Sequence, residues 1–262
     1  MSDHLRLDIN AQGVATVTLT RAEKHNAFDD IVIADLTAVF TELDCNADVR
    51  VVVLAAEGKS FSAGADLSWM QRMASYTETE NHADATALAT MLHCLYSLSK
   101  PTIAAVQGAA FGGAVGLVSC CDMAVASDRA SFCLSEVKLG LIPATISPYV
   151  IQAIGTRMAR RYFLTAERFD AHQAKHMNLV HEVVTSDELN NAVSALTQQL
   201  LSNSPAALTA CKTLIDTVAN QPISAQLRDD TSRRIAAIRV SEQGQEGLTA
   251  FLQKRAPNWV EH

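Results

Sequence analysis

The sequence is short of positive charge and of aromatic side chains. Its 262 residues carry 21 Lys and Arg against 28 Asp and Glu, a net charge of −7, and aromatic residues make up only 5%. No basic tail or lysine-rich run occurs. Phosphate backbones bind clustered Lys and Arg side chains, so we expect no nucleic-acid partner.

Long hydrophobic runs are also missing. The most apolar long stretch, residues 102–126, owes most of its apolar character to alanine and glycine and is interrupted by Gln107 and Asp122, which argues against a transmembrane helix. The chain opens with the polar residues Ser2–His4, and no apolar segment of the signal-peptide type follows. We therefore expect a cytoplasmic protein with no membrane partner.

Motifs for disulfides, metals and nucleotide cofactors are absent. The six cysteines form no C-x-x-C pair and have apolar neighbours, which predicts buried free thiols in a reducing compartment. His172 and His176 are the only histidines with i, i+4 spacing, and no third ligand is near in sequence, so we expect no metal site. Neither G-x-S-x-G nor G-x-G-x-x-G occurs, which excludes the serine-hydrolase elbow and the Rossmann fingerprint.

The apolar patterns that are present predict an α/β fold. Period-two alternation around the Gln12–Gly13 turn predicts a hairpin, and continuous apolar runs predict buried strands. The spacing predicts strands at 5–9, 14–19, 50–55, 102–106 and 123–127. Helices are predicted at 31–44 and near 113–121, with a short helix that begins at Leu67 and a long one that ends near Leu98. After residue 185 the pattern becomes wholly helical, with helices expected at 187–202, 205–219, 223–239 and 242–254.

A glycine-dense turn lies between two predicted strands. Gly108, Gly112 and Gly113 follow the apolar run 102–106 and lead into a small-residue helix. The first N–H groups of a helix have no partner inside it, and such donors stabilise a developing negative charge. Further on, Glu136 stands among apolar residues, which favour the protonated carboxyl and suit a general acid/base.

Three motifs follow one another in the order FSAGADL (61–67), GAAFGGAVGL (108–117) and LSEVKLGLIP (134–143). Together they resemble the crotonase (enoyl-CoA hydratase/isomerase) family over almost the whole chain. The resemblance implies a spiral of repeated ββα units in residues 1–185 that binds acyl-CoA, followed by a helical oligomerisation region, 186–262. It also implies a homotrimer or a dimer of trimers. The substrate would be an acyl-CoA thioester, with no cofactor besides the coenzyme A that the substrate carries.

By the same resemblance, the backbone N–H groups of Ala65 and Gly113 would form an oxyanion hole, and Glu136 matches the family's second catalytic glutamate. Contacts to substrate and coenzyme A are expected from these residues: Lys24, Ala27, Ala63, Gly64, Asp66, Leu67, Gly112, Phe251 and Lys254, the last two reaching a neighbouring subunit. From the residues alone, Asp66 is better explained as the N-cap of the helix that starts at Leu67. Lys24 is equally consistent with a solvated loop lysine.

One departure from the family pattern concerns Gly116, where the usual hydratases carry another glutamate. Two explanations fit this glycine: extra room for a substrate that bears its own carboxylate, or a need for a small residue in helix packing. The runs CCDMA, FCLSEV, GLIPA and TAERFD are similar to hydratases of branched glutaconyl-CoA esters in leucine or acyclic-terpene breakdown. The sequence thus predicts an enoyl-CoA hydratase. An enoyl-CoA isomerase that uses Glu136 alone is the alternative, and a catalytically silent acyl-CoA-binding subunit is a third hypothesis.

Overall fold

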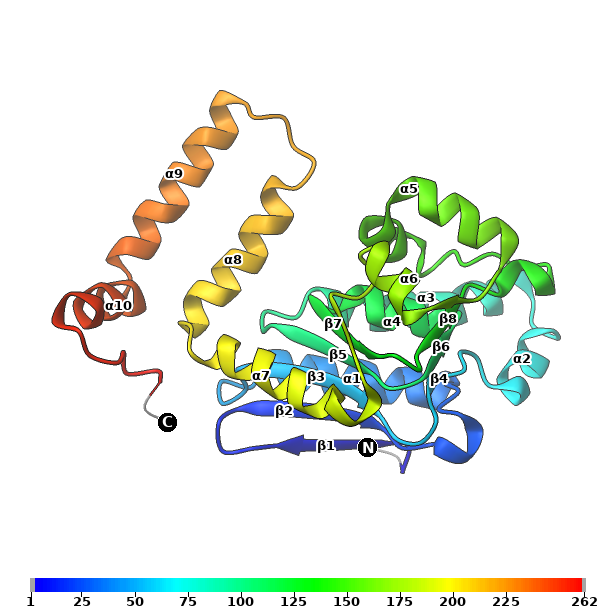
Figure 1. Cartoon of the computed structure of the whole chain (residues 1–262). Coiled ribbons are helices and arrows are strands. Elements are labelled where there is room, and N and C mark those ends of the chain that lie inside the picture. The colour runs from blue at the N-terminus through cyan, green and yellow to red at the C-terminus, as the bar shows by residue number, and fades with distance from the viewer. Residues whose placement is uncertain (1–2, 261–262) are drawn as a thin grey trace.

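The computed structural model describes residues 3–260, and its strands form two sheets (Figure 1). The larger sheet has the order β1-β2-β3-β5-β7-β10 and the smaller one the order β4-β6-β8-β9. The strands are β1 (Leu5–Ile9), β2 (Val14–Leu19), β3 (Val51–Ala56), β4 (Ser60–Ser62), β5 (Thr102–Val106), β6 (Ala109–Phe111), β7 (Met123–Ser127), β8 (Ser131–Cys133), β9 (Phe169–Asp170) and β10 (Glu182–Val184). Antiparallel pairing of β1 with β2 confirms the predicted hairpin.

The helices confirm most of the predicted ranges. They are α1 (Asp30–Cys45), α2 (Leu67–Met73), α3 (Glu78–Tyr96), α4 (Gly113–Cys120), α5 (Ser147–Thr165), α6 (Ala171–His176), α7 (Leu189–Leu201), α8 (Pro205–Val218), α9 (Ala225–Val240) and α10 (Glu242–Gln253). The polar composition of residues 74–82 predicts a break between helices, but α3 begins inside this segment, at Glu78. Its start is stabilised by a capping box, in which Thr77 binds the backbone of Glu80 and Glu80 binds that of Thr77.

The two strands of each successive pair belong to different sheets. The first strand of each pair, β3, β5 and β7, enters the six-stranded sheet, and the second, β4, β6 and β8, enters the four-stranded sheet. Within each sheet these three strands pair in parallel with one another. The chain therefore advances as a spiral of ββα units, as expected. The three short strands were not predicted, because three residues are too few to show a period-two pattern.

Strand β3 shows how the larger sheet is covered on both faces. Val52 and Leu54 belong to a core cluster that includes residues of α1 and α3. Val51 and Val53 belong to a second cluster, together with Leu189 of α7. The continuous apolar run predicted as a strand at 50–55 thus corresponds to β3, which is buried on both faces.

The four helices after residue 185 differ in how they pack. Helix α7 packs against the six-stranded sheet, where Leu189, Val193 and Leu201 are buried. Helices α8 and α9 contain no buried residue, and Figure 1 shows them as a hairpin that extends away from the sheets, with α10 beside it. The helical region therefore begins within the body of the fold, and its role in oligomerisation stays a prediction.

All six cysteines are free thiols, but only three of them are buried. Cys120, Cys121 and Cys133 lie in the interior as expected, whereas Cys45 and Cys211 are exposed. The expectation was wrong for these two because apolar sequence neighbours do not fix which side of a helix a residue occupies. Within residues 3–260, no helix is both long and apolar enough to span a bilayer, and no group of three potential metal ligands comes together.

Candidate active site

The backbone of Ala65 is held by a bridge to Phe28. Phe28 N donates to Gly64 O at 2.9 Å, and Asp66 N donates to Phe28 O at 3.0 Å. These two bonds flank Ala65, whose own N–H donates to no acceptor in the described part of the chain. The bridge therefore leaves the Ala65 N–H as a donor with a fixed direction, in the loop between β4 and α2.

Gly113 supplies a second N–H donor at the first position of α4. Gly112 precedes it with φ 54° and is held by a bond from its own N–H to Cys133 O at 2.8 Å. No residue between 3 and 260 accepts from the Gly113 N–H, as expected at a helix N-terminus. A Cβ on Gly64 would lie 2.8 Å from the carbonyl oxygen of Phe111, so the Gly64–Ala65 and Phe111–Gly113 segments are in contact.

Glu136 lies against the same segment. Its Oε1 atom is 3.3 Å from the position that a Cβ would take on Gly112. Its Oε2 atom is buried and has no hydrogen-bond partner among the described residues. Burial raises the pKa of this carboxyl above its usual value. A half-buried carboxyl with one free oxygen, close to a helix N-terminus with a free N–H, can exchange a proton with a bound molecule.

The space beside Gly116 is filled. A Cβ on this buried glycine would lie 2.2 Å from Ile146 Cγ2 and 3.4 Å from Leu92 Cδ2. A larger residue would therefore collide with the side chain just before α5. The hypothesis that Gly116 leaves extra room for substrate is wrong at this position, because Ile146 occupies that room. The helix-packing explanation is the one that the contacts support.

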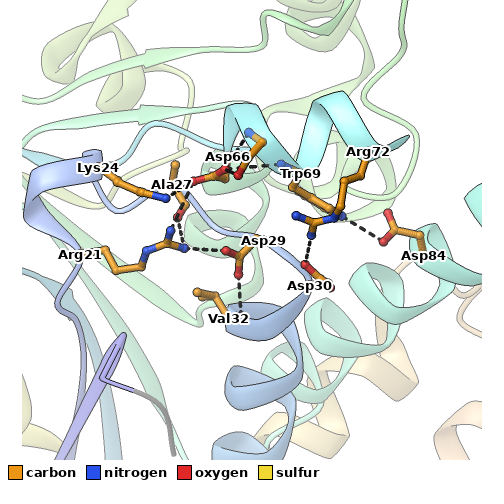
Figure 2. Close-up of polar contacts among 11 residues, drawn as sticks. Arg21, Lys24, Ala27, Asp29, Asp30, Val32, Asp66, Trp69, Arg72 and Asp84 are labelled. Atoms are coloured by element: carbon orange, nitrogen blue, oxygen red, sulfur yellow. Dashed lines mark hydrogen bonds and ion pairs between the residues drawn. The ribbon is translucent and has the colours of Figure 1, made fainter. Parts of the chain in front are cut away.

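Asp66 caps helix α2, as the residue pattern predicted. Its carboxylate accepts from Ser68 N at 2.8 Å and Trp69 N at 3.4 Å, and from the Ser68 hydroxyl (Figure 2). Arg21 Nη2 and Lys24 Nζ each lie 3.3 Å from its Oδ2. Hydrogen bonds from Ser68, followed by Lys24 and Trp69, hold the pKa of Asp66 well below its usual range. Asp66 is thus an ionised structural carboxylate.

The remaining predicted contact residues fall into two groups. Lys24, Ala27 and Ala63 lie in the segments around Asp66, and Leu67 is the first residue of α2. Lys24 is half exposed and Leu67 is 76% exposed. Lys24 is not a free loop lysine, since it pairs with Asp66. Phe251 and Lys254 belong to the end of α10, which Figure 1 places on the opposite side of the molecule from α2. Within one chain, the end of α10 is therefore remote from α2.

Two residues of this region were missed in the sequence. Phe28 pairs with Ala65 through its backbone, and its ring occupies the space beside Gly113, where a Cβ would lie 2.5 Å from Phe28 Cζ. Arg21 is buried and binds Asp29 and Asp66. An aromatic residue inside a polar loop was the available signal for Phe28. Nothing local distinguishes Arg21 from a solvated arginine.

Known proteins resemble this chain over nearly its whole length. The sequence profile of the enoyl-CoA hydratase/isomerase family matches residues 9–262. The crystal structure of an enoyl-CoA hydratase from Shewanella pealeana has a TM-score of 0.95 and 50% identity, covering 98% of this chain and 96% of that one. An enoyl-CoA hydratase structure from Mycobacterium smegmatis has a TM-score of 0.92 and 31% identity, covering 98% and 99%. Carnitinyl-CoA dehydratase of Escherichia coli O157:H7 is 31% identical over 264 residues, 99% of each chain. The chain therefore belongs to the enoyl-CoA hydratase/isomerase (crotonase) family and is an enzyme of that family.

Proposed function

We propose that this enzyme is a hydratase that adds water reversibly across the 2,3 double bond of an acyl-CoA thioester. One observation carries the proposal: the Glu136 carboxyl, with its buried and unpartnered Oε2, lies against the Gly112–Gly113 segment. That segment and the adjoining Ala65 each offer an N–H without an acceptor in residues 3–260. An acid/base and two donors are thus available to one small reacting group.

The oxyanion hole would consist of the Ala65 and Gly113 N–H groups. When a water oxygen attacks C3, the double-bond electrons move toward the thioester and its oxygen gains negative charge. Two fixed N–H donors stabilise that charge, and losing one such donor typically costs ~10²–10³ in rate. The Phe28 bridge fixes one donor and the helix start fixes the other.

Glu136 would serve both proton transfers. As a carboxylate it takes a proton from the attacking water, and as a carboxylic acid it returns a proton to C2 of the enolate. A group that alternates between the two forms works best when its pKa lies near the working pH. Burial moves the pKa of Glu136 in that direction. No second protein carboxylate is needed for this cycle.

The coenzyme A part of the substrate would lie along the loops around Asp66. Lys24 is half exposed and can turn from Asp66 to a phosphate, and Ala27 borders the same loop. Backbone groups of Ala63, Gly64, Leu67 and Gly112 would contact the pantetheine and thioester. Phe251 and Lys254 would come from a neighbouring subunit of a trimer or a dimer of trimers, in which residues 186–262 form the contacts. No further cofactor takes part.

The second candidate is an enoyl-CoA isomerase, and the single glutamate favours it. Moving a double bond requires one base that carries a proton between C2 and C4, which Glu136 alone can do. A silent acyl-CoA-binding subunit is a weaker candidate. It would have no use for a carboxyl kept partly buried and unpartnered, at a cost in stability.

The substrate class that we propose is a branched glutaconyl-type thioester. The support is electrostatic: with Gly116 in place of a second glutamate, the substrate's own carboxylate meets one fewer like charge. The filled space beside Gly116 means that this carboxylate would have to lie elsewhere in the acyl pocket.

Incubation in ¹⁸O-water with crotonyl-CoA, 3-methylglutaconyl-CoA and a 3-enoyl-CoA separates the candidates. Label in the product identifies a hydratase, and a shifted double bond without label identifies an isomerase. Binding without either change identifies the silent subunit, and would overturn the proposed function.

A further inference from the structure

Arg21 is buried although it carries a full charge, with 7% of its side chain exposed. Its Nη1 atom donates to Asp29 Oδ2 at 2.9 Å and to Ala27 O at 3.2 Å. Its Nη2 atom donates to Asp66 Oδ2 at 3.3 Å. The Asp29 and Asp66 side chains are only 13% and 6% exposed. One guanidinium thus joins two loops that are far apart in the sequence (Figure 2).

Each carboxylate that Arg21 binds also begins a helix. Asp29 Oδ1 accepts from Val32 N at 3.1 Å and caps α1, while Asp66 Oδ1 caps α2. In both residues the cap uses one oxygen and Arg21 uses the other. A planar guanidinium with fixed donor directions holds two such partners in one geometry, which a lysine ammonium cannot do. Arg21 therefore fixes where α1 and α2 begin relative to each other.

The two helix starts directly follow the backbone bridge described above. Phe28 precedes Asp29 in the chain, and Ala65 precedes Asp66. The bridge itself has two hydrogen bonds, from Phe28 N and from Asp66 N. Without Arg21, the bridge, the Lys24–Asp66 pair and the bond from Ala63 N to His25 O would still join the segments. The like charges of the two buried carboxylates, Asp29 and Asp66, would however repel with less compensation. The direction of the Ala65 N–H would then be less fixed.

We propose that Arg21 is a positioning residue of the oxyanion site: by binding Asp29, Asp66 and the Ala27 carbonyl, it aims the Ala65 N–H at the thioester oxygen. This inference rests on the proposed function, which supplies the oxyanion. Arg21 does not touch the substrate and acts through the bridge. A misplacement of about 1 Å in a reacting geometry can cost roughly 100-fold in rate.

Arg72 is the matched control. It also joins α2 to α1, by pairing with Asp30, but both side chains are about half exposed, 46% and 53%. Exposed ion pairs contribute little to stability. Removing Arg72 therefore deletes an arginine–aspartate pair between the same two helices and leaves the Phe28–Ala65 bridge intact.

The test compares wild type with Arg21→Met, Arg21→Lys, the double variant Arg21→Met/Asp66→Asn, and Arg72→Met. Asparagine at position 66 keeps the N-cap but removes one of the two like charges. Each protein is assayed for kcat and KM with the better of crotonyl-CoA and 3-methylglutaconyl-CoA. Each is also assayed for Tm and for the absorbance red shift of bound cinnamoyl-CoA, which grows as hydrogen bonds polarise the thioester carbonyl.

We expect Arg21→Met to lower kcat by about 10- to 100-fold with little change in KM, and to reduce the red shift. The double variant should regain Tm but keep the defect in kcat, and Arg72→Met should match wild type. If Arg21→Met does not fold, Arg21→Lys and the double variant carry the same test. Two results would overturn the proposed role of Arg21 and leave the proposed function standing. One is a set of folded Arg21 variants with wild-type kcat and red shift, and the other is a double variant that regains kcat together with Tm. A wild-type enzyme without turnover or red shift would overturn the proposed function, and this inference with it.

Discussion

The ring of Phe28 occupies the space beside Gly113, while the backbone of Phe28 pairs with Ala65. One residue thus contacts both backbone segments whose N–H groups have no acceptor in residues 3–260. This arrangement explains why position 113 must lack a side chain. A Cβ there would lie 2.5 Å from Phe28 Cζ.

The first prediction separates the N–H of Gly113 from the space around it. Gly113→Pro removes the donor and adds a side chain, whereas Gly113→Ala adds a Cβ and keeps the donor. Both variants meet the Phe28 ring, so they should lose similar stability. We expect turnover to vanish in the proline variant and to persist, at a lower rate, in the alanine variant. Steady-state kinetics of the two folded proteins makes the comparison, and equal kcat values would remove Gly113 from the oxyanion role.

The second prediction concerns Glu136→Gln. The amide keeps the shape of the side chain but cannot accept the proton of water. We expect nearly all hydration to be lost while acyl-CoA still binds, because the N–H donors and the loops are unchanged. Titration calorimetry reports the binding and kinetics reports the loss. An active Glu136→Gln enzyme would eliminate the single-base mechanism.

The third prediction is a pH dependence. Burial raises the pKa of Glu136, and hydration begins with the deprotonated form. The acid limb of kcat/KM should therefore lie above the ordinary glutamate pKa of about 4.3. A limb at or below that value, measured from pH 4 upward on stable enzyme, would contradict the proposed protonation cycle.

The same shift has a consequence for stability. The folded protein holds the Glu136 proton more tightly than the unfolded chain, so this group favours folding at low pH and loses that contribution as pH rises through its raised pKa. Glu136→Gln should therefore raise Tm at neutral pH, and the gain should disappear below about pH 4. Melting curves of both proteins across this range give the difference directly, with all other carboxyls in common.

Long periodic segments of this fold could be predicted from the sequence, and short strands could not. The apolar stripe of α1 and the continuous apolar run of β3 extend over enough residues to be recognised in the sequence. Strand β6 (Ala109–Phe111) carries no such pattern and is formed by pairing with β4 and β8. The capping box at Thr77 is present in the sequence, but the polar residues around it favoured a loop.

In the candidate site, too, some features could be predicted from the sequence and others could not. The motifs containing Ala65, Gly113 and Glu136 are local, and the structure brings their segments together. The partners of Arg21 come from two loops, and Ile146 reaches Gly116 from 30 residues further along the chain. Such contacts depend on the final packing, so no local pattern contains them.

The fourth prediction concerns assembly. Helices α8 and α9 bury no residue within one chain, and apolar side chains such as Ile215 and Ile235 are 62% and 49% exposed. Burying such faces between copies would stabilise the hairpin. Light scattering should give a trimer or a dimer of trimers, and Lys254→Ala should raise KM for acyl-CoA without changing kcat. A stable monomer at micromolar concentration would rule out both the assembly and the cross-subunit role of Lys254.

The last prediction concerns the substrate. By the family resemblance, Gly116 stands where the usual hydratases carry a second glutamate, and in the structure Ile146 fills the space beside it. The electrostatic argument for a carboxylate-bearing substrate therefore holds without extra volume: one fewer negative charge faces the substrate. We expect wild type to prefer 3-methylglutaconyl-CoA to crotonyl-CoA in kcat/KM. Gly116→Glu combined with Ile146→Ala, which makes room for the added side chain, should reduce that preference by restoring the repulsion, and Ile146→Ala alone is its control. A tenfold preference of wild type for crotonyl-CoA, about 1.4 kcal/mol in transition-state free energy, would show that the acidic-substrate proposal is wrong.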